Sequence, residues 1–195
     1  MLYKTIDLEQ GTVEWHTFRQ THIGASETAI VMGLSPFKTA RDLYLEKTGF
    51  KIPPPPSYPM IRGIKLEPLA RAIVNETLGV EFTPIVVEHL EHPFISCSLD
   101  GINNSCDAIL EIKCPGRANH EKAIHGEVPV HYQVQIQHQL MVTGAKFCHY
   151  ASYNPEHEET SLAIIPVNPD PVLQEKILAS VIQFWHHVLH LDFPD

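Results

Sequence analysis

Apolar residues follow two different periods along this chain, and the order of those periods predicts an α/β fold. In 64–78 they recur every three to four residues, as at Leu66, Ala70 and Val74, which is typical of an amphipathic helix. Further helices are predicted at 26–32, 39–47, 117–125, 130–142 and 171–189. Short runs with strand character are predicted at 82–88, 94–99, 108–114, 147–153 and 161–167. Helices before, between and after these runs predict a central mixed β-sheet flanked by helices.

The length of the chain and one proline-rich stretch predict its domain organisation. With 195 residues, 44% of them hydrophobic, we expect 1–195 to form a single domain with its own core. Four consecutive prolines, 53–56, force an extended path and forbid helix. Because the roughly 50 residues before them are few for an independent domain, we interpret 51–59 as an internal loop.

Composition narrows the setting in which the protein works. No apolar run approaches the roughly 18 residues of a membrane span, and none opens the chain as a secretory signal would. We therefore expect a cytoplasmic protein without membrane contact, whose four cysteines are reduced. The net charge is −9, whereas nucleic-acid-binding proteins usually lean basic. All but two of the 14 lysines and arginines precede residue 123, so a polyanion site must draw on that part.

Three charged residues in a predicted hairpin are candidates for chemistry. Asp100 follows one predicted strand, and Glu111 and Lys113 share one face of the next, while Ile112 points to the other face. Two carboxylates can hold Mg²⁺ against a phosphodiester, and the lysine can orient or deprotonate water or neutralise developing charge. The alternative is an ordinary cross-strand salt bridge on the surface. Charges inside the apolar run 110–115 are costly unless they are paired or bind metal, which favours a site.

Two predicted helices carry polar residues that could complete this site. Glu67 could add a third carboxylate and support a second cation, or it could be a solvated glutamate on a helix face. Tyr132, Gln135 and Gln139 share one face of a later helix. Their amides and phenol suit contacts with phosphate and bases, although a merely polar helix face is the alternative.

Thirteen histidines raise the question of a zinc site. The densest group, at His186, His187 and His190, has no cysteine or acidic residue at ligand spacing. We therefore interpret it as a solvated helix end.

Six short motifs occur along the chain in an order that resembles a known family. They are Trp15-His16-x-x-Arg19, Gly24-Ala25-Ser26-Glu27, Gly63-x-x-x-Glu67-Pro68-x-Ala70-Arg71, Ser98-Leu99-Asp100-Gly101, Leu110-Glu111-Ile112-Lys113-Cys114-Pro115 and Tyr132-x-x-Gln135-x-Gln137. From about residue 15 to 153 the chain resembles the phage lambda exonuclease/YqaJ-type viral recombinases, a branch of the PD-(D/E)xK nuclease superfamily. The resemblance implies a restriction-endonuclease-like core. One departure is Leu99, which stands where the family has proline before the metal-binding aspartate.

The resemblance also implies an activity and partners. The implied enzyme is a 5′-to-3′ exonuclease that degrades one strand of linear double-stranded DNA processively from an end. It would leave a 3′ single strand for annealing and recombination. We accordingly expect a homotrimeric ring around DNA, a single-strand annealing protein as partner, and a phage or prophage origin in a bacterial host.

Individual roles follow by position in the motifs. Asp100, Glu111 and the carbonyl of Ile112 would hold one Mg²⁺, with Mn²⁺ able to substitute, and Glu67 would join Asp100 at a second ion. Lys113 would be the catalytic lysine. Further positions are Gln135 for the attacking water or the phosphate, Arg19, Ser26 and Ser98 for the 5′-terminal phosphate, and Tyr132 for DNA. The loop 33–39 is a second departure from the family's pattern, and Lys38 and Arg41 are the two candidates for the residue in this region that enters the DNA groove.

Two alternative functions remain open at this point. A catalytically silent DNA-end clamp would bind ends without cutting, but it has no use for acidic residues that repel phosphate. A restriction-type endonuclease on the same fold would cut circular DNA, which an exonuclease leaves intact.

Overall fold

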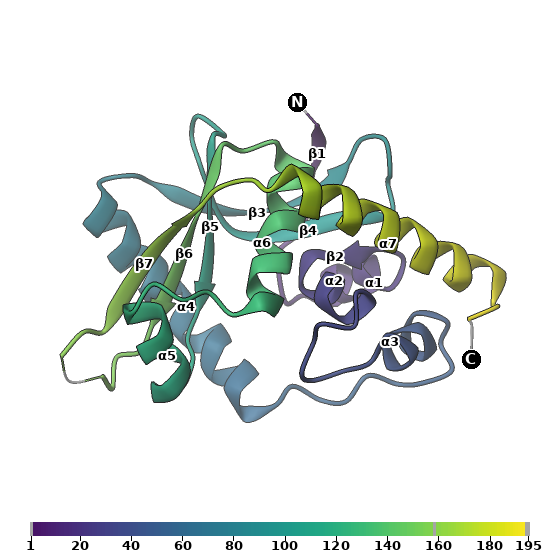
Figure 1. Cartoon of the computed structure of the whole chain (residues 1–195), viewed down its shortest axis with the longest axis horizontal. Helices are drawn as coiled ribbons and strands as arrows, with labels where there is room; N and C mark the ends of the chain where they lie inside the picture. The colour runs from purple at the N-terminus through teal and green to yellow at the C-terminus, as the bar shows by residue number, and fades with distance from the viewer. Residues whose placement is uncertain (1, 158, 194–195) are drawn as a thin grey trace.

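A computed structural model of the chain describes residues 2–157 and 159–193. Within these ranges seven strands form one sheet in the order β1-β3-β4-β5-β6-β7, and β2 pairs with β4 beside this path (Figure 1). The strands are β1 (Tyr3–Ile6), β2 (Ile23–Gly24), β3 (Phe82–His89), β4 (Ile95–Asn103), β5 (Ala108–Lys113), β6 (Phe147–Tyr153) and β7 (Leu162–Val167). Pairs β2–β4 and β5–β6 are parallel and the others antiparallel. The predicted α/β class with a mixed sheet is confirmed.

Helices cover both faces of this sheet. They are α1 (Val13–Gln20), α2 (Ala25–Val31), α3 (Ala40–Lys47), α4 (Tyr58–Leu78), α5 (Arg117–Ile124), α6 (Val130–Thr143) and α7 (Pro171–His190). Figure 1 shows α6 and α7 crossing one face of the sheet, with α4 on the far side. The chain thus has three layers, with β4 and β5 in the middle one.

Two hydrophobic clusters fill the space between the layers. The larger joins Ile109 of β5 to Val134 of α6 and Val181 of α7. The smaller joins Leu110 and Ile112 of β5 to Val74 and its neighbours on α4. Neighbouring residues of β5 therefore enter opposite layers, as strand alternation requires.

The proline-rich loop is shorter than predicted. Helix α4 begins at Tyr58, so the loop that we placed at 51–59 ends at Ser57. Pro59 is compatible with the first helical turn, because an N–H group at that position has no partner within the helix. That 1–195 form one domain stays a prediction.

Strand β4 is longer than predicted. We expected a turn directly after Leu99, but the strand continues to Asn103 because Gly101 and Ile102 pair with β5. Asp100 therefore lies within a strand and has a fixed position.

The elements β1, α1 and β2 had no sequence prediction. Helix α1 has no buried residue and so lacks the apolar stripe that marks a helix, and the two strands contain only four and two residues. Helix α2 begins at Ala25 with Gly24 as its N-cap, where we had placed the cap near Ser26.

Two properties concern the setting of the protein. No helix within the described ranges is long and apolar enough to cross a membrane. In the same ranges Cys97 and Cys148 are buried and the four cysteines carry free thiols.

Candidate active site

Strands β4 and β5 bring the predicted carboxylates and lysine together. Glu111 is 1% exposed, and its Oε1 lies 2.5 Å from Nζ of Lys113. Asp100 Oδ2 accepts a hydrogen bond of 2.7 Å from the backbone N–H of Ile112. The side chain of Ile112 packs in the smaller core on the other face, as expected. The three charged residues thus lie near the end of the β4–β5 pairing, where the charges of Glu111 and Lys113 influence Asp100.

Helix α6 holds Glu111 with two neutral amides. Gln135 Nε2 donates to Glu111 Oε1 over 2.8 Å, and Gln139 Nε2 donates to Oε2 over 2.6 Å. Gln139 is fully buried, and its Oε1 is one of two buried side-chain atoms in the described residues without a hydrogen-bond partner. Both carboxylate oxygens of Glu111 are therefore fixed. Lys113 supplies a positive charge, and the two amides are neutral.

Helix α4 adds the third carboxylate. Glu67 forms an ion pair with Arg71 one turn later, and Arg71 Nε also donates to the backbone carbonyl of Asp100 over 2.6 Å. Arg71 thereby fastens α4 to β4 beside the buried Glu111 and the partly buried Asp100. Glu67 belongs to the same electrostatic site, because Glu111 and Lys113 both influence its pKa.

The acids repel one another. Burial, and then the charges of Glu111 and Glu67, raise the pKa of Asp100 well above its ordinary value. Burial and Glu111 also raise the pKa of Glu67 against the opposing effect of Arg71. Burial lowers the pKa of Lys113, but Glu111 and Asp100 outweigh it and hold the pKa above its ordinary value. Lys113 is therefore an ammonium at neutral pH.

A hard divalent cation fits the chemistry of this donor set. Carboxylate and carbonyl oxygens are the ligands that Mg²⁺ takes in proteins, and a cation would relieve the repulsion that raises the pKa of Asp100. The carboxylate oxygens of Asp100, Glu111 and Glu67 do not all lie within 4.8 Å of one another in the described structure. The oxygens of Glu111 are held by Lys113 and the two amides. The carbonyl of Ile112 as a ligand stays a prediction.

A second cluster forms around Arg19. Its guanidinium lies over the Trp15 ring, 4.7 Å from the centroid, and its Nη2 donates to Ser26 Oγ over 3.3 Å. Trp15 Nε1 donates to Ser98 Oγ over 2.8 Å. The structure therefore gathers the three residues predicted to bind a terminal phosphate, although α1, α2 and β4 contribute one each.

Strand β4 connects the two clusters. Ser98 and Asp100 are two residues apart, so their side chains lie on the same face, roughly 7 Å apart along the strand. A planar guanidinium with neighbouring hydroxyls is suited to phosphate oxygens. One strand thus carries a candidate phosphate contact, Ser98, and a candidate metal ligand, Asp100, side by side.

The remaining predicted DNA contacts lie in different surroundings. Tyr132 is at the acidic site, where Nζ of Lys113 is 4.9 Å from its ring centroid. Lys38 forms an ion pair of 2.7 Å with Glu46 of α3. Arg41 is exposed in the first turn of α3. Contact of these three with DNA stays a prediction.

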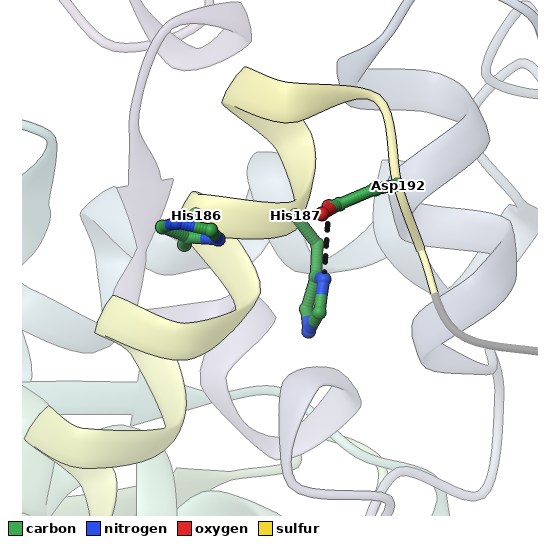
Figure 2. Close-up of side chains that lie close together, drawn as sticks. All are labelled: His186, His187 and Asp192. Carbon is green, nitrogen blue, oxygen red and sulfur yellow. Dashed lines mark hydrogen bonds and ion pairs between the residues drawn. The ribbon is translucent and has the colours of Figure 1, made fainter.

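The histidine-rich helix end differs from its interpretation in one respect. Leu191 adopts a left-handed conformation with φ 55°, and the chain turns so that Asp192 Oδ1 lies 3.1 Å from His187 Nδ1 (Figure 2). An acidic residue therefore does lie near these histidines. Ligand atoms of His186, His187 and Asp192 fall within 4.8 Å of one another at a largely exposed surface.

Several contributors were missed by sequence reasoning. We interpreted the amide of Gln139 as a contact for phosphate and bases and not as a partner of Glu111, and we did not single out Arg71 or Lys47. The spacing of Glu67 and Arg71, one helical turn apart, could have predicted their ion pair. No sequence pattern predicts the contacts of Lys47, because its partners are far away in the sequence.

Known proteins are similar to this chain in sequence and in fold. The model of the YqaJ-like viral recombinase domain family matches residues 14–146. The uncharacterized protein YqaJ of Bacillus subtilis (strain 168) is 28% identical over 190 residues, covering 91% of this chain and 56% of that protein. The chain thus spans little more than half the length of this relative.

Solved structures share the architecture. An alkaline exonuclease from Laribacter hongkongensis matches with a TM-score of 0.82 and 25% identity, covering 93% of this chain and 94% of that one. The same exonuclease in complex with dAMP matches with a TM-score of 0.83. A phage-related exonuclease from Haemophilus somnus 129PT matches in fold, with a TM-score of 0.66 and 14% identity over 87% of this chain and 94% of that one.

Proposed function

Because this chain belongs to the YqaJ-like viral recombinase domain family, we propose that it is a metal-dependent exonuclease acting on the ends of linear double-stranded DNA. The observation that carries the proposal is the position of the acidic site beside the Arg19 cluster on one face of β4. A phosphate held at the cluster would place the neighbouring phosphodiester near Asp100 and Glu111. The similar fold of an alkaline exonuclease supports the same activity.

The proposed cofactor is Mg²⁺, with Mn²⁺ as a substitute. Asp100, Glu111 and the carbonyl of Ile112 would hold one ion, and Glu67 with Asp100 a second. The ions would supply a Lewis acid for the phosphate and a more acidic bound water. Lys113 would neutralise charge that develops on the phosphate, since its raised pKa keeps it protonated.

The amides and the phenol would orient the reacting groups. Gln135 would hold Glu111 and, through the same face of α6, the water or phosphate. Tyr132 packs over Lys113 and would restrict the ammonium to the site. Arg19, Ser26 and Ser98 would bind the 5′-terminal phosphate, so that cleavage runs 5′ to 3′ and leaves a 3′ single strand.

The biological setting is proposed on family membership. We propose that the chain acts in phage-type recombination in the bacterial cytoplasm, as a homotrimeric ring that hands its product to a single-strand annealing protein. Sedimentation with and without duplex DNA would measure the assembly. A monomer under both conditions would contradict the ring.

The function can be tested with one timed digestion. Linear duplex DNA labelled at either the 5′ or the 3′ end is incubated with Mg²⁺ or with EDTA, beside a circular duplex without nicks. We expect early release of the 5′ label, late release of the 3′ label, no reaction in EDTA and intact circles. Cut circles would indicate an endonuclease, and binding without digestion would indicate an end clamp.

A further inference from the structure

Three helices bring three charges together behind the Arg19 cluster. Glu27 of α2 lies 3.4 Å from Nη2 of Arg19 on α1 and 2.9 Å from Nζ of Lys47 at the end of α3. The side chains of Arg19, Glu27 and Lys47 are 26%, 12% and 5% exposed. The only one of the three that faces solvent to a useful extent is therefore the guanidinium.

Lys47 is fixed in this arrangement by all of its donors. Besides Glu27, its Nζ donates to the backbone carbonyls of Arg19 over 2.6 Å and His22 over 2.7 Å. An ammonium has three protons, so its hydrogen-bonding capacity is filled. Glu27 Oε2 also accepts from the N–H of Gly24 over 2.9 Å, at the start of α2. The pair thus joins the end of α1 to the beginning of α2 and the end of α3.

Arg19, Glu27 and Lys47 together carry one net positive charge. The charges of Glu27 and Lys47 cancel, and the charge of Arg19 remains. The neighbouring Lys38 is already paired with Glu46, over 2.7 Å. In a protein of net charge −9, Arg19 is therefore a local positive group at the surface.

We propose that Lys47 is a positioning residue that neutralises Glu27 and so keeps Arg19 available to a terminal phosphate. The inference rests on the proposed function, because it assigns the phosphate to the Arg19 cluster. Without Lys47, the poorly solvated carboxylate of Glu27 would keep Arg19 as its ion-pair partner among the described residues and would compete with the phosphate for it. Glu27 has contacts of its own in this arrangement, because it lies beside the guanidinium that donates to Ser26 and accepts from the N–H of Gly24.

The charge-balance role predicts different effects for two substitutions at one ion pair. In Lys47→Met, Glu27 loses its partner, and preference for a phosphorylated end should fall roughly tenfold, because an ion pair with Arg19 must be broken. In the double variant Glu27→Gln/Lys47→Met, both charges are gone and the amide can still accept from Arg19. Preference should return to within about twofold of wild type. A merely structural role for Lys47 predicts no such recovery.

The test measures binding, separately from cleavage. Duplexes with a 5′-phosphate or a 5′-hydroxyl and a fluorophore at the 3′ end are titrated by anisotropy in EDTA and in Ca²⁺. The readout is the ratio of the two dissociation constants, and Arg19→Ala defines complete loss. Preserved preference in Lys47→Met, or equal loss in the single and double variants, would overturn the inference.

Two further results separate this inference from the proposed function. If the wild-type protein does not discriminate the two ends, phosphate binding at the Arg19 cluster and this inference are both wrong, whatever the Mg²⁺-dependent digestion shows. If Lys47→Met does not fold, Glu27→Gln takes its place. Charge balance then predicts a preference that is retained or increased, and a loss as large as that of Arg19→Ala overturns the inference.

Discussion

Asp100 and Ile112 are joined by a hydrogen bond from the backbone of β5 to a side chain of β4, 2.7 Å long. The paired residues of the two strands are Gly101 with Leu110 and Ile102 with Ile109, so this bond lies where the regular pairing stops. A carboxylate oxygen takes the place of a backbone acceptor there. The same residue thus extends the β4–β5 contact beyond the last backbone pair and carries a charge that Glu111 and Glu67 both influence.

These two roles of Asp100 can be separated by substitution. Asp100→Asn keeps an acceptor for Ile112 and removes a repelling charge, so stability should be retained while Mg²⁺-dependent digestion is lost. Asp100→Ala loses both, and should be about 1 kcal/mol less stable than the asparagine variant. Urea unfolding and initial digestion rates measure the two effects. An active Asp100→Asn enzyme would remove this residue from the metal site.

Lys113 should be essential for turnover. In Lys113→Ala the charge beside Glu111 is gone, and digestion should slow by about 100-fold or more. Lys146→Ala is a matched control, because that lysine is 76% exposed and pairs with Asp107 away from the acidic site. Its digestion rate should stay near wild type. Equal rates for both variants would contradict the assignment.

Arg19 should determine which DNA ends are digested. Arg19→Ala should reduce the preference for 5′-phosphorylated over 5′-hydroxyl ends by roughly tenfold or more, since charge-assisted hydrogen bonds are lost. Arg117→Ala, at a 77% exposed arginine that pairs with Glu121, serves as the control for the general effect of losing a cation. For each variant, the digestion rates of a 5′-phosphorylated and a 5′-hydroxyl duplex of the same sequence are compared. If Arg117→Ala loses as much preference as Arg19→Ala, the effect is not local to the Arg19 cluster.

Buried His138 should make the fold sensitive to acid. Burial lowers its pKa to about 4; its Nδ1 lies 2.6 Å from Thr28 Oγ1 and its Nε2 donates to the carbonyl of Ser96. Between the unfolded pKa of about 6.5 and the folded value, the unfolded chain binds the proton more readily. Stability should therefore fall as pH decreases from about 6.5 to 4, by on the order of 3 kcal/mol.

The measurement requires a variant because Asp100 acts with the opposite sign. Its raised pKa makes the folded state less favourable as pH rises. We therefore compare the urea unfolding free energy of wild type and His138→Gln at each pH, so that the contribution of Asp100 cancels. The difference should decrease toward pH 4. A constant difference would show that His138 does not titrate as described.

Gly101 should not tolerate a side chain. A Cβ at this position would lie 2.6 Å from Phe82 Cβ and 3.3 Å from Leu110 Cβ, so Gly101→Ala should cost about 1–3 kcal/mol of stability. Gly63→Ala is the contrast, because no atom lies within 4 Å of its added Cβ and alanine favours the helix by about 0.5–1 kcal/mol. Thermal unfolding should move in opposite directions for the two variants. A tolerated Gly101→Ala would mean that β3 and β4 can separate at this point.

Which charged residues meet at the candidate site was easier to predict from the sequence than the contacts that hold them there. Alternation along β5 was enough to separate Glu111 and Lys113 from Ile112, because a strand has only two faces. The order of the motifs located Glu67 and the Arg19 cluster. The contacts of Gln139 and Lys47 could not be predicted, because they depend on how α6 and α3 pack against distant elements. Helix α1 was not predicted, because none of its residues is buried and no apolar stripe marks it.

The short strand β2 has a consequence for the size of the released fragment. It joins the segment that carries Arg19 and Ser26 to β4 through only two residue pairs, Ile23 with Ile95 and Gly24 with Ser96. If the chain digests ends as proposed, this junction, together with Ser98 on β4, would set the distance between the bound terminal phosphate and the scissile bond. Fragment length would then be dictated by protein geometry and not by base sequence, and every round of hydrolysis would advance by the same increment.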